Sequence, residues 1–344
     1  MPIHPVQTAR RLREAYIRYL KTIKPFQDDR LREEFSRALE AENMLVKGPY
    51  LELTPPFALG KMIVELMQES ILSRRFQSFC HDQSSLPEQL YWHQEQAIRK
   101  AREGRNLVIA TGTGSGKTEA FLIPILDSLA REAEAGTLSQ PGVRALLLYP
   151  MNALANDQMK RLRGYLKNFP QITFGRYVGD TQHTYDKALE LYKQVNGEEP
   201  LENELISREQ MQKTPPHILL TNYAMLEYLL LRPADTALFD GETGKHWRFI
   251  VLDEAHAYDG AQATEIAMLL RRLQDRVTQG GQKRLQAFAV SATLGEDTPE
   301  TRAKIAQFAT KLFALDFAPE DVIFSRREPE SGLTSIWGRG TPDL

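Results

Sequence analysis

The residues best suited to chemistry lie between positions 106 and 119, in the stretch NLVIATGTGSGKTE. Small and apolar residues predict a buried strand there, followed by a glycine-rich turn and an amphipathic helix. Glycines adopt backbone angles that side chains forbid, so the N–H groups of the turn can surround an anion at the helix N-terminus. Lys117 would reach the β- and γ-phosphates of a nucleotide, and the Thr118 hydroxyl would hold Mg²⁺. The stretch therefore predicts a phosphate-binding P-loop with the cofactor-binding residues Thr113, Gly114, Ser115, Gly116, Lys117 and Thr118.

The match to the P-loop pattern has one departure, because Thr111 stands where the pattern has its first glycine. A glycine-rich turn without a ligand is the alternative interpretation. Upstream, Tyr91 and Gln94 suit an adenine site, since an aromatic ring can stack on the base and an amide can both donate and accept hydrogen bonds. For these two residues the alternative is an ordinary helix N-terminus with a buried aromatic side chain. Together the two segments predict a site for ATP and Mg²⁺.

Other polar motifs follow further predicted strands. Asp253, Glu254 and His256 come directly after the apolar segment 247–252, and Ser291 and Thr293 come after segment 286–290. Strands that alternate with helices predict an α/β fold with a mostly parallel sheet covered by helices on both faces. Ligands bind such sheets at the carboxyl ends of the strands, where these motifs lie. The expected strands are 107–110, 143–149, 172–178, 217–220, 247–252 and 286–290.

Composition restricts the class of protein. The chain has 344 residues, a net charge of −2 and a single cysteine, Cys80, so an internal disulfide or a cysteine zinc cluster is excluded. A charge near zero argues against a whole-surface electrostatic grip on nucleic acid, although a basic stripe on one face remains open. No apolar run is long enough for a membrane helix, and the N-terminus lacks the apolar core of a signal peptide. We therefore expect a cytoplasmic protein without a membrane partner.

Taken in order, these segments resemble the first motor domain of a superfamily 2 helicase of the DEAD/DEAH-box kind. TGTGSGKT is similar to motif I, YPMNALANDQ to motif Ia, TNYAMLEYLL to a nucleic-acid motif, VLDEAH to motif II and SATL to motif III. One such motif is moderately specific, whereas five in this order are very specific, and they extend over about residues 86–317. The residues of motifs Ia and II most resemble those of bacterial YprA/MrfA-like DNA helicases and of phage-defence helicases of the DISARM and Druantia type.

The resemblance implies a RecA-like fold and a role for each catalytic residue. Asp253, with Thr118, would hold the metal, Glu254 would orient and deprotonate the attacking water, and Lys117 would neutralise phosphate charge. His256 would couple the nucleotide site to motif III through Ser291 and Thr293. The alternative for the acidic motif is a helix cap after a strand, and for Ser291 and Thr293 it is a polar strand end.

The family also implies contacts to a nucleic-acid backbone, with DNA favoured over RNA. Small residues and amides at helix N-termini can donate hydrogen bonds to phosphates without reading the sequence. Plain helix capping is the alternative at each position. The residues expected at this interface are Asn152, Ala153, Gly179, Asp180, Thr221 and Asn222.

The predicted organisation has three parts: an N-terminal helical region over 1–85, a RecA-like ATP-binding domain over 86–325, and a tail over 326–344. Residues 57–79 are expected to form one helix, and residues 182–213 a solvated surface excursion. A second RecA-like domain, in cis or in a partner chain, is expected to supply the arginine that the phosphates need. Two other hypotheses stay open. The first is a module that binds nucleic acid or a partner protein and uses nucleotide only as a conformational switch. The second is a P-loop kinase or metabolic ATPase, but this hypothesis does not explain the SATL and TNYAML motifs.

Overall fold

The computed structural model describes residues 4–41, 44–45, 55–79, 86–112, 114–278, 285–292 and 295–328, apart from the side chain of Ala153. The chain divides into two compact units, Met1–Pro55 and Pro56–Leu344. Of the helices in the described ranges, none is long and apolar enough to cross a membrane.

The first unit contains helices α1 (Pro5–Ile23) and α2 (Asp29–Glu40). The Asp28 side chain caps α2 by accepting a hydrogen bond of 2.9 Å from the Leu31 N–H. Lys21 of α1 forms an ion pair of 2.6 Å with Glu40 of α2. The two predicted helices are therefore present, and their apolar faces are largely exposed, with Ile17 and Leu39 as the buried positions.

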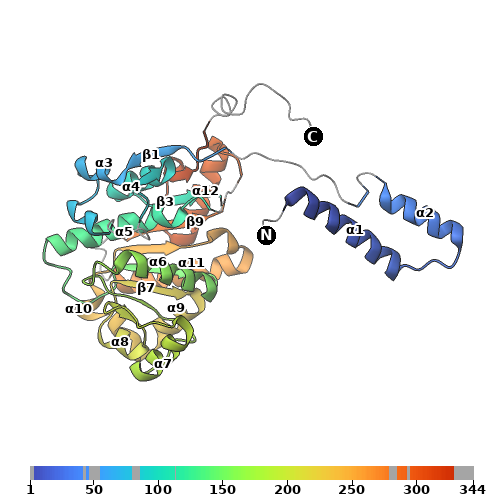
Figure 1. The fold of residues 1–344 in the computed structure, drawn as a ribbon. Helices are drawn as coiled ribbons and strands as arrows, with labels where there is room; N and C mark the ends of the chain where they lie inside the picture. The colour runs from blue at the N-terminus through green and yellow to red at the C-terminus, as the bar shows by residue number, and fades with distance from the viewer. Residues whose placement is uncertain are drawn as a thin grey trace. The chain divides into compact units, whose positions relative to one another are not determined.

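The second unit is built on a parallel sheet, as expected (Figure 1). Within the described residues, eight strands pair side by side in the order β10-β3-β9-β8-β4-β7-β5-β6. Every neighbouring pair is parallel. The α/β class is therefore confirmed, and the strands are β3 (Leu107–Ala110), β4 (Ala145–Tyr149), β5 (Phe174–Arg176), β6 (Glu204–Leu205), β7 (Ile218–Asn222), β8 (Phe249–Leu252), β9 (Gln286–Ser291) and β10 (Val322–Phe324).

Helices cover both faces of this sheet. Successive side chains of a strand point to opposite faces, so Leu107 and Ile109 enter one apolar core while Val108 and Ala110 enter the other. Helices α4 (Trp92–Arg102), α5 (Lys117–Glu134) and α6 (Asn152–Leu166) complete the first core. Helices α9 (Tyr223–Leu231), α11 (Gly260–Val277) and α12 (Pro299–Phe313) complete the second. Because strands buried on both faces are held rigidly, their carboxyl ends form a firm base for a site.

The segment that precedes the P-loop differs from the prediction. Residues 57–79 form strand β1 (Leu59–Met62), helix α3 (Ile63–Gln68) and the 3₁₀ helix η1 (Arg74–Phe79) instead of one helix. Strand β1 pairs antiparallel with β2 (Gln89–Tyr91), and Phe76 and Phe79 are buried in the first core of the sheet. The unit boundary thus lies at Pro55/Pro56 rather than near residue 85, because this segment packs with the sheet. Cys80 lies outside the described residues.

Residues 182–213 also differ from the expected solvated excursion. They contain α7 (Tyr185–Asn196), the edge strand β6 and α8 (Arg208–Lys213). Glu204 of β6 is buried and accepts two hydrogen bonds of 2.8–2.9 Å from Arg163 of α6 at one of its oxygens. A buried carboxylate needs such a partner, so this segment is part of the packed unit. The remaining short elements are η2 (Pro233–Leu238), α10 (Gly241–Gly244), η3 (Ala255–Ala257) and η4 (Pro319–Asp321).

The last described residues return to the start of the second unit. Arg327 forms an antiparallel bridge with Phe57, and backbone hydrogen bonds of 2.9 Å join Ala58 to Arg326 and Glu328 to Pro56. The Arg326 guanidinium lies 3.7 Å from the centre of the Trp92 ring, within the range of a cation–π interaction. Residues 326–328, expected in a tail, therefore pack with the second unit, and residues 329–344 lie outside the described part of the chain.

Candidate nucleotide site and nucleic-acid face

The P-loop connects β3 to α5, as the sequence predicts. Gly114 and Gly116 have φ values of +76° and +72°, a left-handed conformation that side chains rarely adopt. Gly116 is the N-cap of α5, so Lys117 and Thr118 begin the helix. The buried Ser115 hydroxyl donates a hydrogen bond of 2.7 Å to the Thr111 hydroxyl, a contact that a glycine at position 111 could not make. Thr113, the remaining predicted loop residue, lies outside the described part of the structure.

Gln94 holds the P-loop from the side of α4. Its carbonyl oxygen accepts a hydrogen bond of 2.8 Å from the Tyr91 N–H, and its Nε2 donates one of 2.9 Å to the Gly116 carbonyl. A Cβ at position 116 would lie 2.3 Å from Gln94 Nε2, so Gly116 is needed for close approach as well as for its backbone angle. The Tyr91 ring stacks beside His93 at 5.7 Å. The adenine role of Tyr91 and Gln94 stays a prediction, and the structure adds a clamp on the P-loop that the sequence did not indicate.

His93 is a further residue of this site that sequence reasoning missed. Its ring is fully buried, and Nε2 lies 2.8 Å from the Ser115 carbonyl. Burial lowers the pKa of His93 below its ordinary value, so the ring is neutral at pH 7. A histidine one residue before Gln94 was the available signal, but neither charge nor periodicity marks it as a contact to the loop.

The acidic motif lies opposite the P-loop at the end of β8. Lys117 Nζ is 3.4 Å from Glu254 Oε1, and the other Glu254 oxygen is 3.2 Å from His256 Nδ1. The same His256 nitrogen lies 3.0 Å from the Ser291 hydroxyl at the end of β9. A continuous line of polar contacts therefore joins Lys117, Glu254, His256 and Ser291. Thr293, the second expected coupling residue, lies outside the described ranges.

Glu254 has an unusual backbone conformation. Its φ and ψ are +49° and +45°, the left-handed region in which a side chain costs about 1–2 kcal/mol. This turn lies between β8 and η3, and it aims the carboxylate at Lys117 instead of continuing the strand. Strained residues of this kind concentrate at functional sites because the surrounding structure holds them in place.

Two oxygen donors suited to Mg²⁺ belong to Thr118 and Asp253. The Thr118 hydroxyl, near the start of α5, accepts a hydrogen bond of 3.3 Å from Gln158 Nε2 of α6. Asp253 Oδ1 accepts one of 2.9 Å from the Glu254 N–H. Burial, with a smaller contribution from the charge of the Glu254 carboxylate, raises the pKa of Asp253 to about 6. Gln158 is a neighbour of the site that sequence reasoning did not single out.

The raised pKa of Asp253 predicts a gain in stability from Asp253→Asn. An unfolded aspartate has a pKa of about 3.9, so the folded chain binds this proton more tightly and loses stability as the pH rises toward 6. Above pH 6 the charge on this partly buried side chain costs the fold about 2–3 kcal/mol. Asparagine carries no charge, so the variant should unfold with a free energy higher by about 1–3 kcal/mol at pH 7.5.

Urea denaturation monitored by circular dichroism tests this prediction. The gain should halve by about pH 5 and disappear near pH 4. Asp275→Asn removes an exposed carboxylate from α11 and is the matched control, which should leave stability unchanged. An Asp253→Asn variant that is less stable than the wild type at pH 7.5 would contradict the assignment of a costly buried charge.

The expected nucleic-acid contacts are brought together at the carboxyl edge of the sheet, with one exception. Asn222 Nδ2 donates a hydrogen bond of 2.9 Å to Asn152 Oδ1, across the neighbouring strands β7 and β4. Asn222 also caps α9 by accepting from the Met225 N–H at 2.8 Å. The exposed residues Gly179 and Asp180 follow β5, and Ala153 lies in the first turn of α6. These positions form a common face, although the structure itself contains no nucleic acid.

Thr221 is the exception. Its side chain is fully buried, and its hydroxyl donates a hydrogen bond of 2.6 Å to the Tyr177 carbonyl. The hydroxyl thus ties β7 to the segment after β5 and does not reach the surface. A residue at the end of a central strand is buried on both faces, so any contact of Thr221 with nucleic acid would have to use its backbone, and that contact stays a prediction.

The fold and the site define an α/β domain with a P-loop, and family comparison names its class. Residues 91–301 match the family model of the DEAD/DEAH box helicases, so the chain belongs to this family. Among curated relatives, the Druantia protein DruE of Escherichia coli is 30% identical over 95% of this chain. The ATP-dependent helicase YprA of Bacillus subtilis is 30% identical over 54% of it. The chain covers only 22% and 20% of these two relatives.

Solved structures agree on the fold. The DUF1998 helicase MrfA bound to DNA matches with a TM-score of 0.56 and 23% identity, covering 79% of this chain and 29% of that one. The DEAD-box helicase Mss116 bound to single-stranded RNA matches with a TM-score of 0.54 and 18% identity, covering 79% of this chain and 46% of that one. The RecA-like architecture is therefore established.

Proposed function

We propose that this chain is the ATP-binding motor domain of a DNA helicase or translocase that hydrolyses ATP efficiently only with a second RecA-like domain. The line of contacts from Lys117 through Glu254 and His256 to Ser291 carries this proposal. These contacts link the predicted phosphate site to the end of β9. Binding or hydrolysis of the nucleotide could therefore alter the side chains along the carboxyl edge of the sheet. The asparagine pair of α6 and β7 stands at that same edge, where the nucleic-acid backbone would lie.

The residues present fit ATP and Mg²⁺. Among the described residues, apart from the chain neighbours of Gly114, no atom lies within 4 Å of the position that a Cβ would take there, so open space lies beside the P-loop backbone, whose N–H groups can bind an anion. Thr118 and Asp253 would hold Mg²⁺, which prefers oxygen ligands and, when bound, spreads the charge of the transferred phosphoryl group.

Each side chain then has a defined task in phosphoryl transfer. Lys117 would leave Glu254 and bind the phosphates, which frees the carboxylate to orient a water molecule and accept its proton. His256, held by Ser291, would keep Glu254 in position. The strained backbone of Glu254 limits the directions in which this carboxylate can point.

The relatives favour DNA as the nucleic acid along which this domain would move. The structure that matches with a TM-score of 0.56 is that of MrfA bound to DNA. The similarity to the Druantia protein DruE, 30% identical over 95% of this chain, supports the resemblance to phage-defence helicases. The matches to DNA-bound MrfA, at 23% identity, and to an RNA-bound DEAD-box helicase, at 18% identity, support the fold alone.

The alternative function is a switch that binds nucleotide without motor activity. ATP turnover measured with and without a supplied second RecA-like domain separates the two functions. Turnover that rises when the second domain and single-stranded DNA are added supports the motor. Nucleotide binding without turnover under both conditions would favour the switch.

Nucleic-acid binding should be weak, insensitive to sequence and sensitive to salt. Contacts through amides and N–H groups carry no base information, and one motor domain neutralises few phosphates. We expect unrelated single-stranded oligonucleotides to bind with similar affinity and with a slope of log affinity against log salt of roughly −2. Fluorescence anisotropy over a salt series measures both.

Asn222→Asp provides the variant for this measurement. Aspartate is also a good N-cap, so α9 should stay intact while the new charge repels phosphate and weakens binding about three- to tenfold. Gln307→Glu adds the same charge to the exposed face of α12 and is the control. Unchanged affinity in Asn222→Asp, or tight binding to one oligonucleotide sequence only, would contradict the proposed face.

A further inference from the structure

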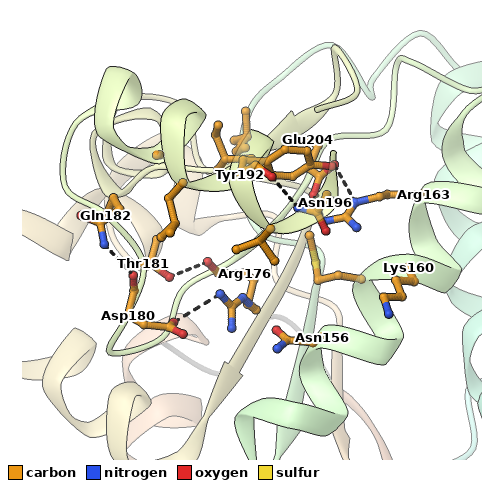
Figure 2. Close-up of a pocket in the computed structure, with 16 residues that line it drawn as sticks. Asn156, Lys160, Arg163, Arg176, Asp180, Thr181, Gln182, Tyr192, Asn196 and Glu204 are labelled. Atoms are coloured by element: carbon orange, nitrogen blue, oxygen red, sulfur yellow. Dashed lines mark hydrogen bonds and ion pairs between the residues drawn. The ribbon is translucent and has the colours of Figure 1, made fainter. Parts of the chain in front are cut away.

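A cleft of about 470 Å³ lies beside the predicted nucleic-acid face and is assigned to no part of ATP chemistry. It is enclosed by α6, the end of β5, α7 and β6 (Figure 2). Its volume falls in the range of small-molecule sites, which is about 300–1,000 Å³. The residues that line its walls indicate which kind of ligand it could bind.

One wall of the cleft is apolar. Ala188, Leu191 and Val195 recur at helical spacing along α7 and line the cleft together. Leu191 is 41% exposed and Val195 is 73% exposed, so these two side chains face open space, while Ala188 is buried at the base of the stripe. Met159 of α6 lies deeper and adds to the same apolar lining. Exposed apolar groups in a cleft favour a ligand with an apolar face.

The opposite wall carries positive charge. Lys160 of α6 is exposed, and in the described ranges no ion pair joins it to an acidic side chain. Arg176 at the end of β5 has its Nη2 3.3 Å from Asp180, while its Nη1 is buried without a hydrogen-bond partner among the described residues. A buried donor without a partner is costly, so this nitrogen would gain from an acceptor on a ligand.

The floor of the cleft is preformed. Arg163 lies 5.0 Å above the Tyr192 ring and forms charge-assisted hydrogen bonds with Glu204. The Tyr192 hydroxyl donates to the same carboxylate at 3.0 Å. These three side chains satisfy one another and join α6, α7 and β6 at one end of the cleft, where Figure 2 shows them grouped together. The charges of Arg163 and Glu204 are thereby neutralised, which leaves Lys160 and Arg176 for the ligand.

The cleft is continuous with the expected backbone track. Asn152, Asn156 and Lys160 are spaced by four residues on α6 and are all exposed, so they lie on one side of the helix. Asn152 belongs to the nucleic-acid face, and Asn156 and Lys160 line the cleft. Asp180, expected to contact nucleic acid, also lines it. A strand that follows α6 from the sheet edge therefore arrives at the cleft.

We propose that this cleft receives one unstacked nucleotide of the bound single strand, an inference that rests on the proposed function. The base lies against the apolar stripe of α7, and its phosphate meets Lys160 and Arg176. Asp180 can accept a hydrogen bond from an exocyclic amino group or a sugar hydroxyl. A nucleotide matches both walls, whereas a free phosphate would leave the apolar stripe exposed and an apolar peptide would leave Lys160 and Nη1 of Arg176 without an acceptor.

Filling the cleft tests the proposal. Val195→Trp places a large ring at an exposed position, so the fold should be unaffected, and Gln194→Trp adds the same ring to α7 outside the cleft lining. The binding of labelled single-stranded oligodeoxynucleotides, intact or with one abasic site moved along the strand, is measured by anisotropy. Binding of a labelled ATP analogue serves as the folding control.

In the wild type, an abasic site at one strand position should weaken binding about five- to tenfold, since each base contact contributes substantially. Val195→Trp should weaken binding of the intact strand by the same factor and abolish the abasic effect, while Gln194→Trp changes neither. Strands that bind wild type and Val195→Trp equally, or that show no sensitive position, would overturn the cleft assignment and leave the proposed function standing. A wild-type chain that binds ATP analogue but no oligonucleotide would refute the proposed function itself.

Discussion

Glu254→Gln is expected to lower ATP turnover by about 10²–10⁴-fold, the usual contribution of a positioned general base. The amide keeps the shape of the carboxylate but cannot accept a proton from the attacking water. Binding should survive, and it should become slightly tighter. Glu254 lies 3.4 Å from Lys117, so its charge would compete with the phosphates for this lysine.

Turnover is measured by phosphate release with the second RecA-like domain supplied, and binding by titration of a labelled ATP analogue. Glu265→Gln, on the exposed face of α11, removes one carboxylate away from the motif and should behave as wild type. Full turnover in Glu254→Gln would show that another group activates the water. Loss of binding would show that Glu254 has a structural role instead.

Lys117→Ala should weaken ATP binding by about 30- to 100-fold. Charge-assisted hydrogen bonds to phosphate contribute about 1.5–3 kcal/mol each, and the Lys117 side chain is only 13% exposed, so water replaces it poorly. The substitution also leaves Glu254 without its cation, which adds repulsion toward the phosphates. Alanine favours helices, so the start of α5 should be preserved.

The same ATP-analogue titration measures this effect. Lys187→Ala removes an exposed lysine from α7 and is the control for charge. Wild-type affinity in Lys117→Ala would refute the P-loop assignment, whatever the fold. The double variant with Glu254→Gln should recover part of the lost affinity, because it removes the repulsion that the single variant creates.

The P-loop site could be predicted because its signals are local. The strand, the glycines and the Gly-Lys-Thr sequence are contiguous, and φ values of Gly114 and Gly116 follow from that pattern. The six expected strands are present because each is an apolar run between polar turns. Strand β10 was missed since three apolar residues carry no periodicity, and β6 was missed because it has only two residues.

The features that the sequence did not predict depend on tertiary packing. The segment that precedes Gln89 has apolar residues at helical spacing, yet it pairs as β1 with β2 and ends in a 3₁₀ helix. Thr221 looked like a helix-opening polar residue, but its place in a central strand buries it. The cleft next to α7 was invisible because α6, β5, α7 and β6 are separate in sequence and meet only in the fold.

The bridge between Phe57 and Arg327 has a mechanical consequence. Since the first and last described residues of the second unit meet at one antiparallel contact, tension between residues 56 and 328 would load those few hydrogen bonds before the sheet. The contact lies against the ring of Tyr91, because Phe57 is 5.3 Å from it. Force on the flanking chain and a base bound at the adenine position predicted for Tyr91 would thus act on the same pair of aromatic rings.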